Sequence, residues 1–189
     1  MKRRAFVVLM MWTVLPSSRL MSQSIVNATS TATSAPNPTD VASVDAIIAA
    51  LYDANTNLVD QKRDADRYRS LFVPGARLMP TSRPPNGKGT IAIETVDDYV
   101  RRAVSSPRRH GFNEREIART SEAFGNIVQV FSTYETHVDS TDTYPHRGIN
   151  SIQLFNDGAR WWVVGVLWAI ERPDQPIPTA FLKRTPRAN

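Results

Sequence analysis

The spacing of apolar side chains changes near residue 110, from a helical repeat to the alternation typical of β-strands. In the first half, apolar residues recur every three or four positions behind a capping Thr39 or Asp40, which predicts a helix. Its apolar positions are Val41, Val44, Ile47, Ile48, Leu51 and Tyr52. A second helix is expected over about 60–72, ended by Pro74-Gly75. A third begins at the capping sequence 95–98 and stops before Pro107.

Strands account for most of the remaining pattern. Two short strands are expected over 76–80 and 90–94, joined by a turn-rich loop at 83–89. Four longer strands are expected one after another, over 113–123, 126–138, 147–155 and 160–171. Helices followed by a run of consecutive strands predict an α+β fold, with a curved antiparallel sheet wrapped over the helices.

The last hairpin allows two registers. A two-residue turn at Asp157-Gly158 would place Ile152 and Leu154 on the same face as Trp161 and Val163. A three-residue turn at 156–158, pairing Phe155 with Ala159, is preferred because it makes one face wholly apolar. That face then holds Ile152, Leu154, Trp162, Val164, Val166 and Trp168. The other face keeps Trp161, Val163 and Leu167, which predicts a partner there, most simply a second copy of the chain.

The first residues have the pattern of a signal peptide. Three basic residues precede an apolar stretch at 5–15, which is too short to span a bilayer. We expect a signal peptide over 1–24, with an uncleaved membrane anchor as the alternative, and a flexible linker over 25–39. The folded domain is expected over 40–182 and a tail over 183–189. The protein is therefore expected to be exported, periplasmic or secreted, with no membrane association after cleavage.

Charge and cysteine content exclude several functions. The formal net charge is +5, but four of the 23 basic residues and none of the 18 acidic ones lie in 1–24, which leaves +1. A nearly neutral mature chain gives no reason to expect nucleic acid as a partner. The absence of cysteine excludes disulfides and thiol chemistry, so stability must come from the core.

Several side chains on the expected inner sheet face are candidates for a site. On the concave side of the sheet, Glu116 would be desolvated, and its raised pKa would suit a general acid or base; otherwise it is a surface carboxylate near Arg115. Ser132 and Tyr134 share the apolar phase of their strand, so each hydroxyl needs a ligand or a neighbouring backbone group. Asn150 lies on the phase of Ile152 and could orient a ligand carbonyl.

Aromatic residues and histidines complete the candidates. Tyr68 and Trp168 could form aromatic walls of a ligand site or simply pack in the core. The histidines and aspartates at 137–146 match no metal-ligand spacing, so no metal is expected. The sequence contains no Gly-x-Ser-x-Gly motif and no glycine-rich phosphate loop, and no cofactor is expected.

The element order and three sequence stretches resemble the nuclear transport factor two-like superfamily. The stretches are FGNIVQVFSTYE at 124–135, RGINSIQL at 147–154, and RWWVV at 160–164 with 168–178. They are similar to bacterial SnoaL-like proteins of unassigned function, over about 40–182. The resemblance implies a cone-shaped α+β fold, with the sheet wrapped over three N-terminal helices, a pocket inside the cone, and frequent dimers through the outer face.

One departure from this superfamily bears on activity. Its isomerases carry a carboxylate base on the first strand after the second helix, whereas the expected strand at 76–80 contains no acid. Our leading hypothesis is an exported, dimeric domain that binds a small, largely apolar molecule without a cofactor. The alternatives are a cofactor-free enzyme, such as an isomerase, dehydratase or hydrolase, that uses Glu116 and Tyr134 for proton transfer, and a structural or interaction module whose cone is filled by side chains.

Overall fold

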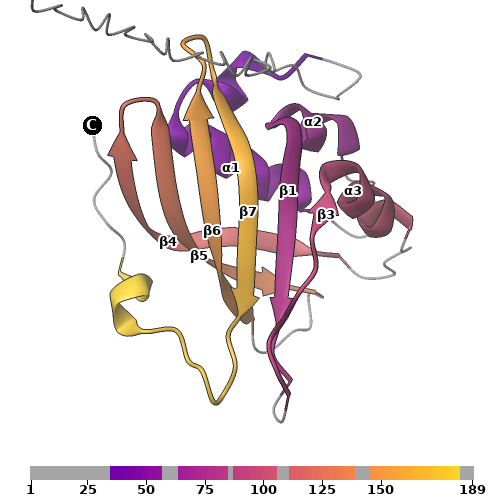
Figure 1. Ribbon diagram of the computed structural model, residues 1–189, viewed down its shortest axis with the longest axis vertical. Coiled ribbons are helices and arrows are strands. Elements are labelled where there is room, and N and C mark those ends of the chain that lie inside the picture. Colours follow the sequence, from indigo (N-terminus) through magenta and orange to yellow (C-terminus); the bar gives the residue numbers. More distant parts are fainter. Residues whose placement is uncertain (1–34, 57–63, 85–86, 106–110, 139–144, 184–189) are drawn as a thin grey trace, which may run out of the picture.

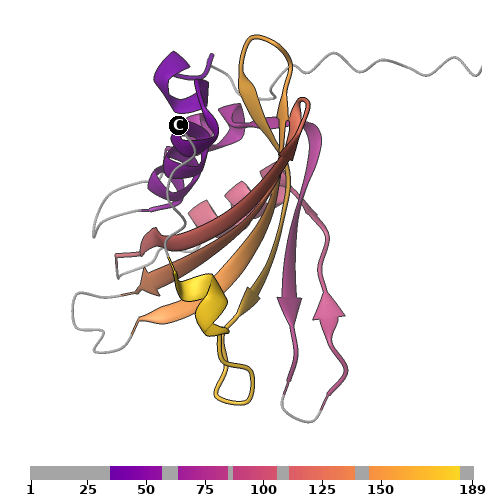
Figure 2. The same cartoon turned by 90° about the vertical axis from the view of Figure 1, so that its left-hand side faces the viewer.

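Helices cover the concave side of a strongly curved sheet (Figures 1 and 2). The computed structural model describes residues 35–56, 64–84, 87–105, 111–138 and 145–183, so the expected signal peptide and most of the expected linker lie outside the described residues. The helices are η1 (Pro38–Val41), α1 (Val44–Asn55), α2 (Ala65–Ser70), α3 (Val96–Ser105) and η2 (Thr179–Leu182). Among the described residues, no helix has the length and apolar character needed to cross a membrane.

Within the described residues the sheet has seven strands, and its long strands form the expected meander. They are β1 (Phe72–Ser82), β2 (Thr90–Ile91), β3 (Glu94–Thr95), β4 (Asn113–Phe124), β5 (Ile127–His137), β6 (His146–Asn156) and β7 (Trp161–Ile170). The order across the sheet is β2-β1-β7-β6-β5-β4, and β3 also pairs with β1. The α+β prediction is confirmed, with one difference: β1 runs parallel to β7, which makes the sheet mixed rather than wholly antiparallel.

The second helix is shorter than predicted, and the following strand is longer. α2 ends at Ser70, and β1 already begins at Phe72, which pairs with Val163. Pairing resumes at Arg77, so Pro74 and Gly75 form an irregularity within the strand instead of ending a helix. The tertiary pairing with β7 therefore decided the structure of 72–75, and local turn signals did not.

The preferred register of the last hairpin is wrong. Phe155 pairs with Trp162 rather than with Ala159, because the loop covers four residues, 157–160. The Asp157 carboxylate closes this loop by accepting hydrogen bonds from the backbone N–H groups of Ala159 and Arg160 and from Trp162 Nε1.

A bulge at residue 164 then changes the phase of β7, because Leu154 pairs with Val163 and Gln153 pairs with Gly165. Val163 is consequently fully buried, and Trp161 packs against the core. Of the three residues that predicted a partner on the outer face, only Leu167 lies there, with 37% of its surface exposed.

A second bulge lies in β4. Glu116 pairs with Tyr134, and the next pair joins Ala118 to Thr133, so Ile117 has no partner of its own across the ladder. On the outer side of the same strands, η2 packs against β4 and β5. Its Phe181 carbonyl accepts a hydrogen bond of 2.6 Å from the Thr133 hydroxyl.

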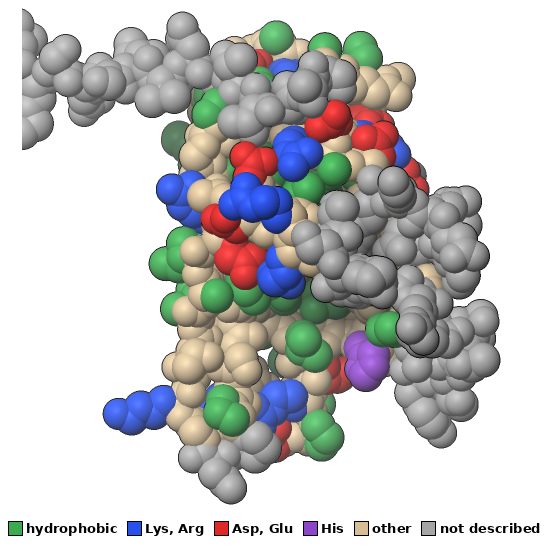
Figure 3. Space-filling view, turned by 90° about the vertical axis from the view of Figure 1, so that its right-hand side faces the viewer, with side chains coloured by type: hydrophobic (Ala, Val, Ile, Leu, Met, Phe, Trp, Pro, Cys, Tyr) green, Lys and Arg blue, Asp and Glu red, His purple; other side chains and the backbone are tan. Residues whose placement is uncertain are grey.

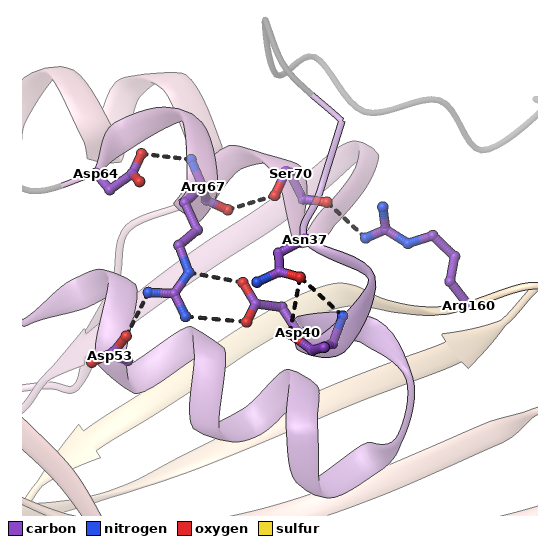
Figure 4. Close-up of polar contacts among 8 residues, drawn as sticks. Asn37, Asp40, Asp53, Asp64, Arg67, Ser70 and Arg160 are labelled. Carbon is purple, nitrogen blue, oxygen red and sulfur yellow. Dashed lines mark hydrogen bonds and ion pairs between the residues drawn. The ribbon is translucent and has the colours of Figure 1, made fainter.

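Arg67 joins the N-terminal elements (Figure 4). Its guanidinium donates through Nε and Nη2 to the two Asp40 carboxylate oxygens, at 2.8 and 3.1 Å, and through Nη1 to Asp53. Arg160, from the β6–β7 loop, donates to the Ser70 carbonyl at 2.7 Å. These contacts hold η1 and α1 to α2, and α2 to the tip of the sheet.

Candidate functional site

A cavity of about 490 Å³ lies between the helices and the concave face of the sheet. Figure 3 shows a hollow on this side of the molecule, beneath a cluster of acidic and basic side chains. Its lining comes from α1, α2, α3 and six strands, and includes Tyr52, Asn55, Tyr68, Tyr99, Phe112, Glu114, Tyr134, Asn150, Val166 and Trp168. The cone is therefore open in the described structure, which speaks against the hypothesis that side chains fill it.

Aromatic rings form one wall of the cavity. Tyr68 stacks on Tyr99 with 5.5 Å between ring centroids, and Trp168 meets Tyr99 edge to face at 6.3 Å. Contacts between rings fix their orientation in addition to burying apolar area. Both residues predicted as aromatic walls, Tyr68 and Trp168, line the cavity, while their part in ligand binding stays a prediction.

Tyr134 lines the cavity and carries a hydroxyl. Only 6% of the residue is exposed, and burial, together with the charge of Glu114, raises the pKa of Tyr134 well above its ordinary value. Among the described residues, no group forms a hydrogen bond with this hydroxyl. The phenol therefore stays protonated at neutral pH and can donate to a ligand.

Ser132 and Asn150 belong to one hydrogen-bond chain that reaches from the cavity into the protein. Asn150 Nδ2 donates to the Tyr52 hydroxyl at 2.9 Å, and this hydroxyl lies 2.7 Å from Ser132 Oγ. Ser132 Oγ donates to Glu116 Oε1 at 2.6 Å. Asn150 and Tyr52 line the cavity, whereas Ser132 and Glu116 lie behind its wall.

Glu116 points inward but does not face the cavity. Arg119 holds its carboxylate, with Nη2 2.6 Å from Oε2 and Nε 3.0 Å from both oxygens. Arg115, the neighbour expected for a surface Glu116, pairs instead with Glu135. A catalytic part for Glu116 stays a prediction, and it would have to act on a ligand through Ser132, Tyr52 and Asn150.

A second polar group in the cavity escaped the sequence reasoning. Tyr99 donates its hydroxyl to Asn55 Oδ1 at 2.8 Å, and Asn55 Nδ2 lies 3.5 Å from Glu114 Oε1. Thr136 Oγ1 donates to Glu114 Oε2 at 3.3 Å. One signal was available: Glu114 lies two residues before Glu116, so alternation places both on the inner face.

The residues at 137–146, whose spacing predicts no metal site, are described by the structure only in part. His137 Nε2 lies 3.7 Å from Glu135 Oε1, His146 lines the cavity, and Asp139 and Asp142 lie outside the described residues. Within the described part of the chain, no three or more histidine, cysteine, aspartate or glutamate side chains are grouped so that they could hold a metal ion.

Comparison with known proteins gives solved structures only. No family model and no curated protein matches the chain. Similar solved structures include an NTF2-like protein of unknown function from Shewanella baltica, with 13% identity, 57% of this chain and 80% of that chain covered, and a TM-score of 0.40. A second, from Silicibacter pomeroyi, has 11% identity, coverage of 69% and 94%, and a TM-score of 0.46.

A third similar structure comes from Nostoc punctiforme and is described as a protein of unknown function with a cystatin-like fold. It has 12% identity, coverage of 68% and 87%, and a TM-score of 0.49. The structures from Shewanella baltica and Silicibacter pomeroyi are both described as NTF2-like. None of the three descriptions states a ligand or an activity.

Proposed function

We propose that this protein binds a small, largely apolar molecule in the cavity between its helices and its concave sheet face. The observation that carries this proposal is the cavity itself, about 490 Å³ in volume and walled mainly by aromatic and aliphatic side chains, with a minority of polar ones that include Asn55, Glu114 and Asn150. Small-molecule sites have this size and composition, with a small number of polar atoms that fix the ligand's orientation. The expected signal peptide at 1–24 supports the further proposal that binding takes place outside the cytoplasm.

Native mass spectrometry of the gently purified protein is the first test. A bound molecule adds mass that disappears on denaturation, and its identification would give the ligand directly. Indan, an apolar bicyclic molecule, serves as a probe when no ligand is carried along. The proposal is wrong if neither a carried molecule nor the probe binds.

A matched pair of variants locates the binding. Ile170 lines the cavity and Ile127 does not, yet the two are almost equally exposed, at 54% and 55%. Ile170→Trp is expected to weaken indan binding by narrowing the cavity, whereas Ile127→Trp leaves it unchanged. Equal effects of the two variants would place the bound molecule elsewhere.

A cofactor-free enzyme is a second candidate, favoured by the buried and protonated Tyr134 hydroxyl in the cavity. Once the carried molecule is known, incubation with the protein would reveal its conversion by mass spectrometry. Tyr134→Phe is then expected to retain binding and lose conversion. A ligand that returns unchanged from the wild-type protein would contradict catalysis.

A further inference from the structure

The direction of every hydrogen bond in the chain from Glu116 to Asn150 follows from its carboxylate end. The Glu116 carboxylate, paired with Arg119, can only accept, so the single Ser132 hydrogen points to Glu116. Ser132 must then accept from the Tyr52 hydroxyl. Burial raises the pKa of Tyr52, so this hydroxyl keeps its hydrogen. Having donated to Ser132, Tyr52 accepts from the amide nitrogen of Asn150.

This order fixes which atom of Asn150 is available to a ligand. The amide nitrogen gives one of its two hydrogens to Tyr52, whereas the oxygen Oδ1 is the acceptor that takes no part in this chain of hydrogen bonds. Asn150 is only 7% exposed, and in the described part of the chain no group donates to its Oδ1. A buried acceptor without a donor is costly, and a ligand that supplies the donor removes this cost.

We propose that Asn150 Oδ1 is the acceptor by which the cavity selects ligands carrying an O–H or N–H group on an apolar frame. Glu116 is a positioning residue in this proposal. Through Ser132 and Tyr52 it determines that the Asn150 amide turns its oxygen to the ligand, and it does not touch the ligand itself. The inference rests on the proposed function, because it names the polar feature of the ligand in that same cavity. It reverses the sequence-based expectation that Asn150 orients a ligand carbonyl.

Replacing Glu116 by glutamine should reverse the direction of the hydrogen bonds that link residue 116 to Asn150. The Oε2 position faces two Arg119 donors, Nη2 and Nε, whereas the Oε1 position faces Nε and Ser132 Oγ. The glutamine oxygen therefore prefers the Oε2 position, and its nitrogen donates to Ser132. Ser132 then donates to Tyr52, and Tyr52 donates to Asn150, whose amide turns its nitrogen to the ligand.

Three bicyclic probes of similar size test this proposal: indole as an N–H donor, 1-indanone as a carbonyl acceptor, and indan as neither. Their affinities for the full chain are measured by calorimetry or by titration followed by NMR. In the wild-type protein we expect indole to bind roughly two- to tenfold more tightly than indan or 1-indanone, the range of one net hydrogen bond. In Glu116→Gln we expect 1-indanone to bind more tightly than indole.

Two further variants separate this effect from a loss of structure. Ser132→Ala interrupts the chain but keeps the Glu116–Arg119 pair, and it should bring the affinities for indole and 1-indanone close together. Glu122→Gln makes the same charge change at an exposed position of β4 and should leave the wild-type order intact. If Glu116→Gln does not fold, Ser132→Ala still tests the proposal.

The outcomes distinguish this inference from the proposed function. Wild-type protein that binds indan as tightly as indole, or prefers 1-indanone, overturns the inference and leaves the cavity as a binding site. An order of affinities that is the same in wild type, Glu116→Gln and Ser132→Ala also overturns it. If none of the three probes binds and the purified protein carries no molecule, the proposed function fails, and the inference fails with it.

Discussion

Tyr134 faces Gly148 across the β5–β6 pair, and its hydroxyl occupies the space where any other residue would place a Cβ atom. A Cβ atom at residue 148 would collide with this hydroxyl and with the Ala169 carbonyl. Glycine is therefore required here by close approach. The buried Tyr134 hydroxyl therefore packs directly against the backbone of Gly148, next to the cavity that Tyr134 lines.

Gly148→Ala is accordingly expected to lower the free energy of unfolding by about 1–3 kcal/mol, the usual cost of overpacking. Urea unfolding of the variant measures this loss. Tyr134→Leu removes the hydroxyl from the clash, so Gly148→Ala should cost less in that background, in a double-mutant cycle. Additive effects would show that the Ala169 carbonyl alone makes the position intolerant.

Alkaline pH should destabilise the protein partly through Tyr134. Burial raises the pKa of Tyr134 above the value of 10.0 that it has when unfolded. The unfolded chain thus loses this proton first, and the contribution to stability is complete below pH 10 and declines as the pH rises above it. Urea midpoints at about pH 9 and pH 11 should fall less in Tyr134→Phe than in wild type. Equal declines would mean that Tyr134 titrates normally in the folded state.

Arg67→Ala should lower the free energy of unfolding by about 1–3 kcal/mol, because it leaves the largely buried Asp40 carboxylate without its bidentate partner. Arg101→Ala is the matched control, since Arg101 and Asp98 form an exposed pair on α3 that should contribute little to stability. Thermal or urea unfolding compares the two. Similar losses would show that Arg67 acts only as a surface residue.

A homodimer through the outer sheet face stays a prediction, but the exposed apolar residues that support it differ from those expected from the sequence. Val164 and Leu167 are each 37% exposed there, in place of the buried Val163 and the core-packed Trp161. Leu167→Glu should therefore turn a dimer into a monomer in sedimentation velocity, with secondary structure unchanged. A wild-type monomer at micromolar concentration would contradict the prediction.

Periodicity was sufficient where one element's own sequence decides its structure. The apolar repeat of α1 and the alternation of β4 to β7 predicted these elements, and the same alternation placed Ser132, Tyr134 and Asn150 on the inner face. The capping sequence of α3 was also confirmed, with Thr95 Oγ1 accepting from the Asp98 N–H and the Asp98 carboxylate accepting from the Thr95 N–H.

The remaining features depend on contacts between distant segments. The parallel pairing of β1 with β7 sets the start of β1 and the irregularity at Pro74-Gly75, and no local signal reports it. As an apolar position of its helix, Tyr52 is predicted to lie in the core, and the repeat does not show which partner its buried hydroxyl finds. Its partner, Ser132, is 80 residues away, so the packing of α1 on β5 had to be known first.

The bulge at Ile117 has a consequence for comparing this protein with its relatives. In a regular strand, residues three apart point to opposite sides, yet Glu116 and Arg119 meet on the same side because one extra residue lies between them. The positions of β4 that point to this side are therefore even-numbered before the bulge and odd-numbered after it. An alignment that opens or closes a gap of one residue here would assign Arg119 to the wrong face. Homologues without the insertion should therefore lose the ion pair even where both residue types are retained.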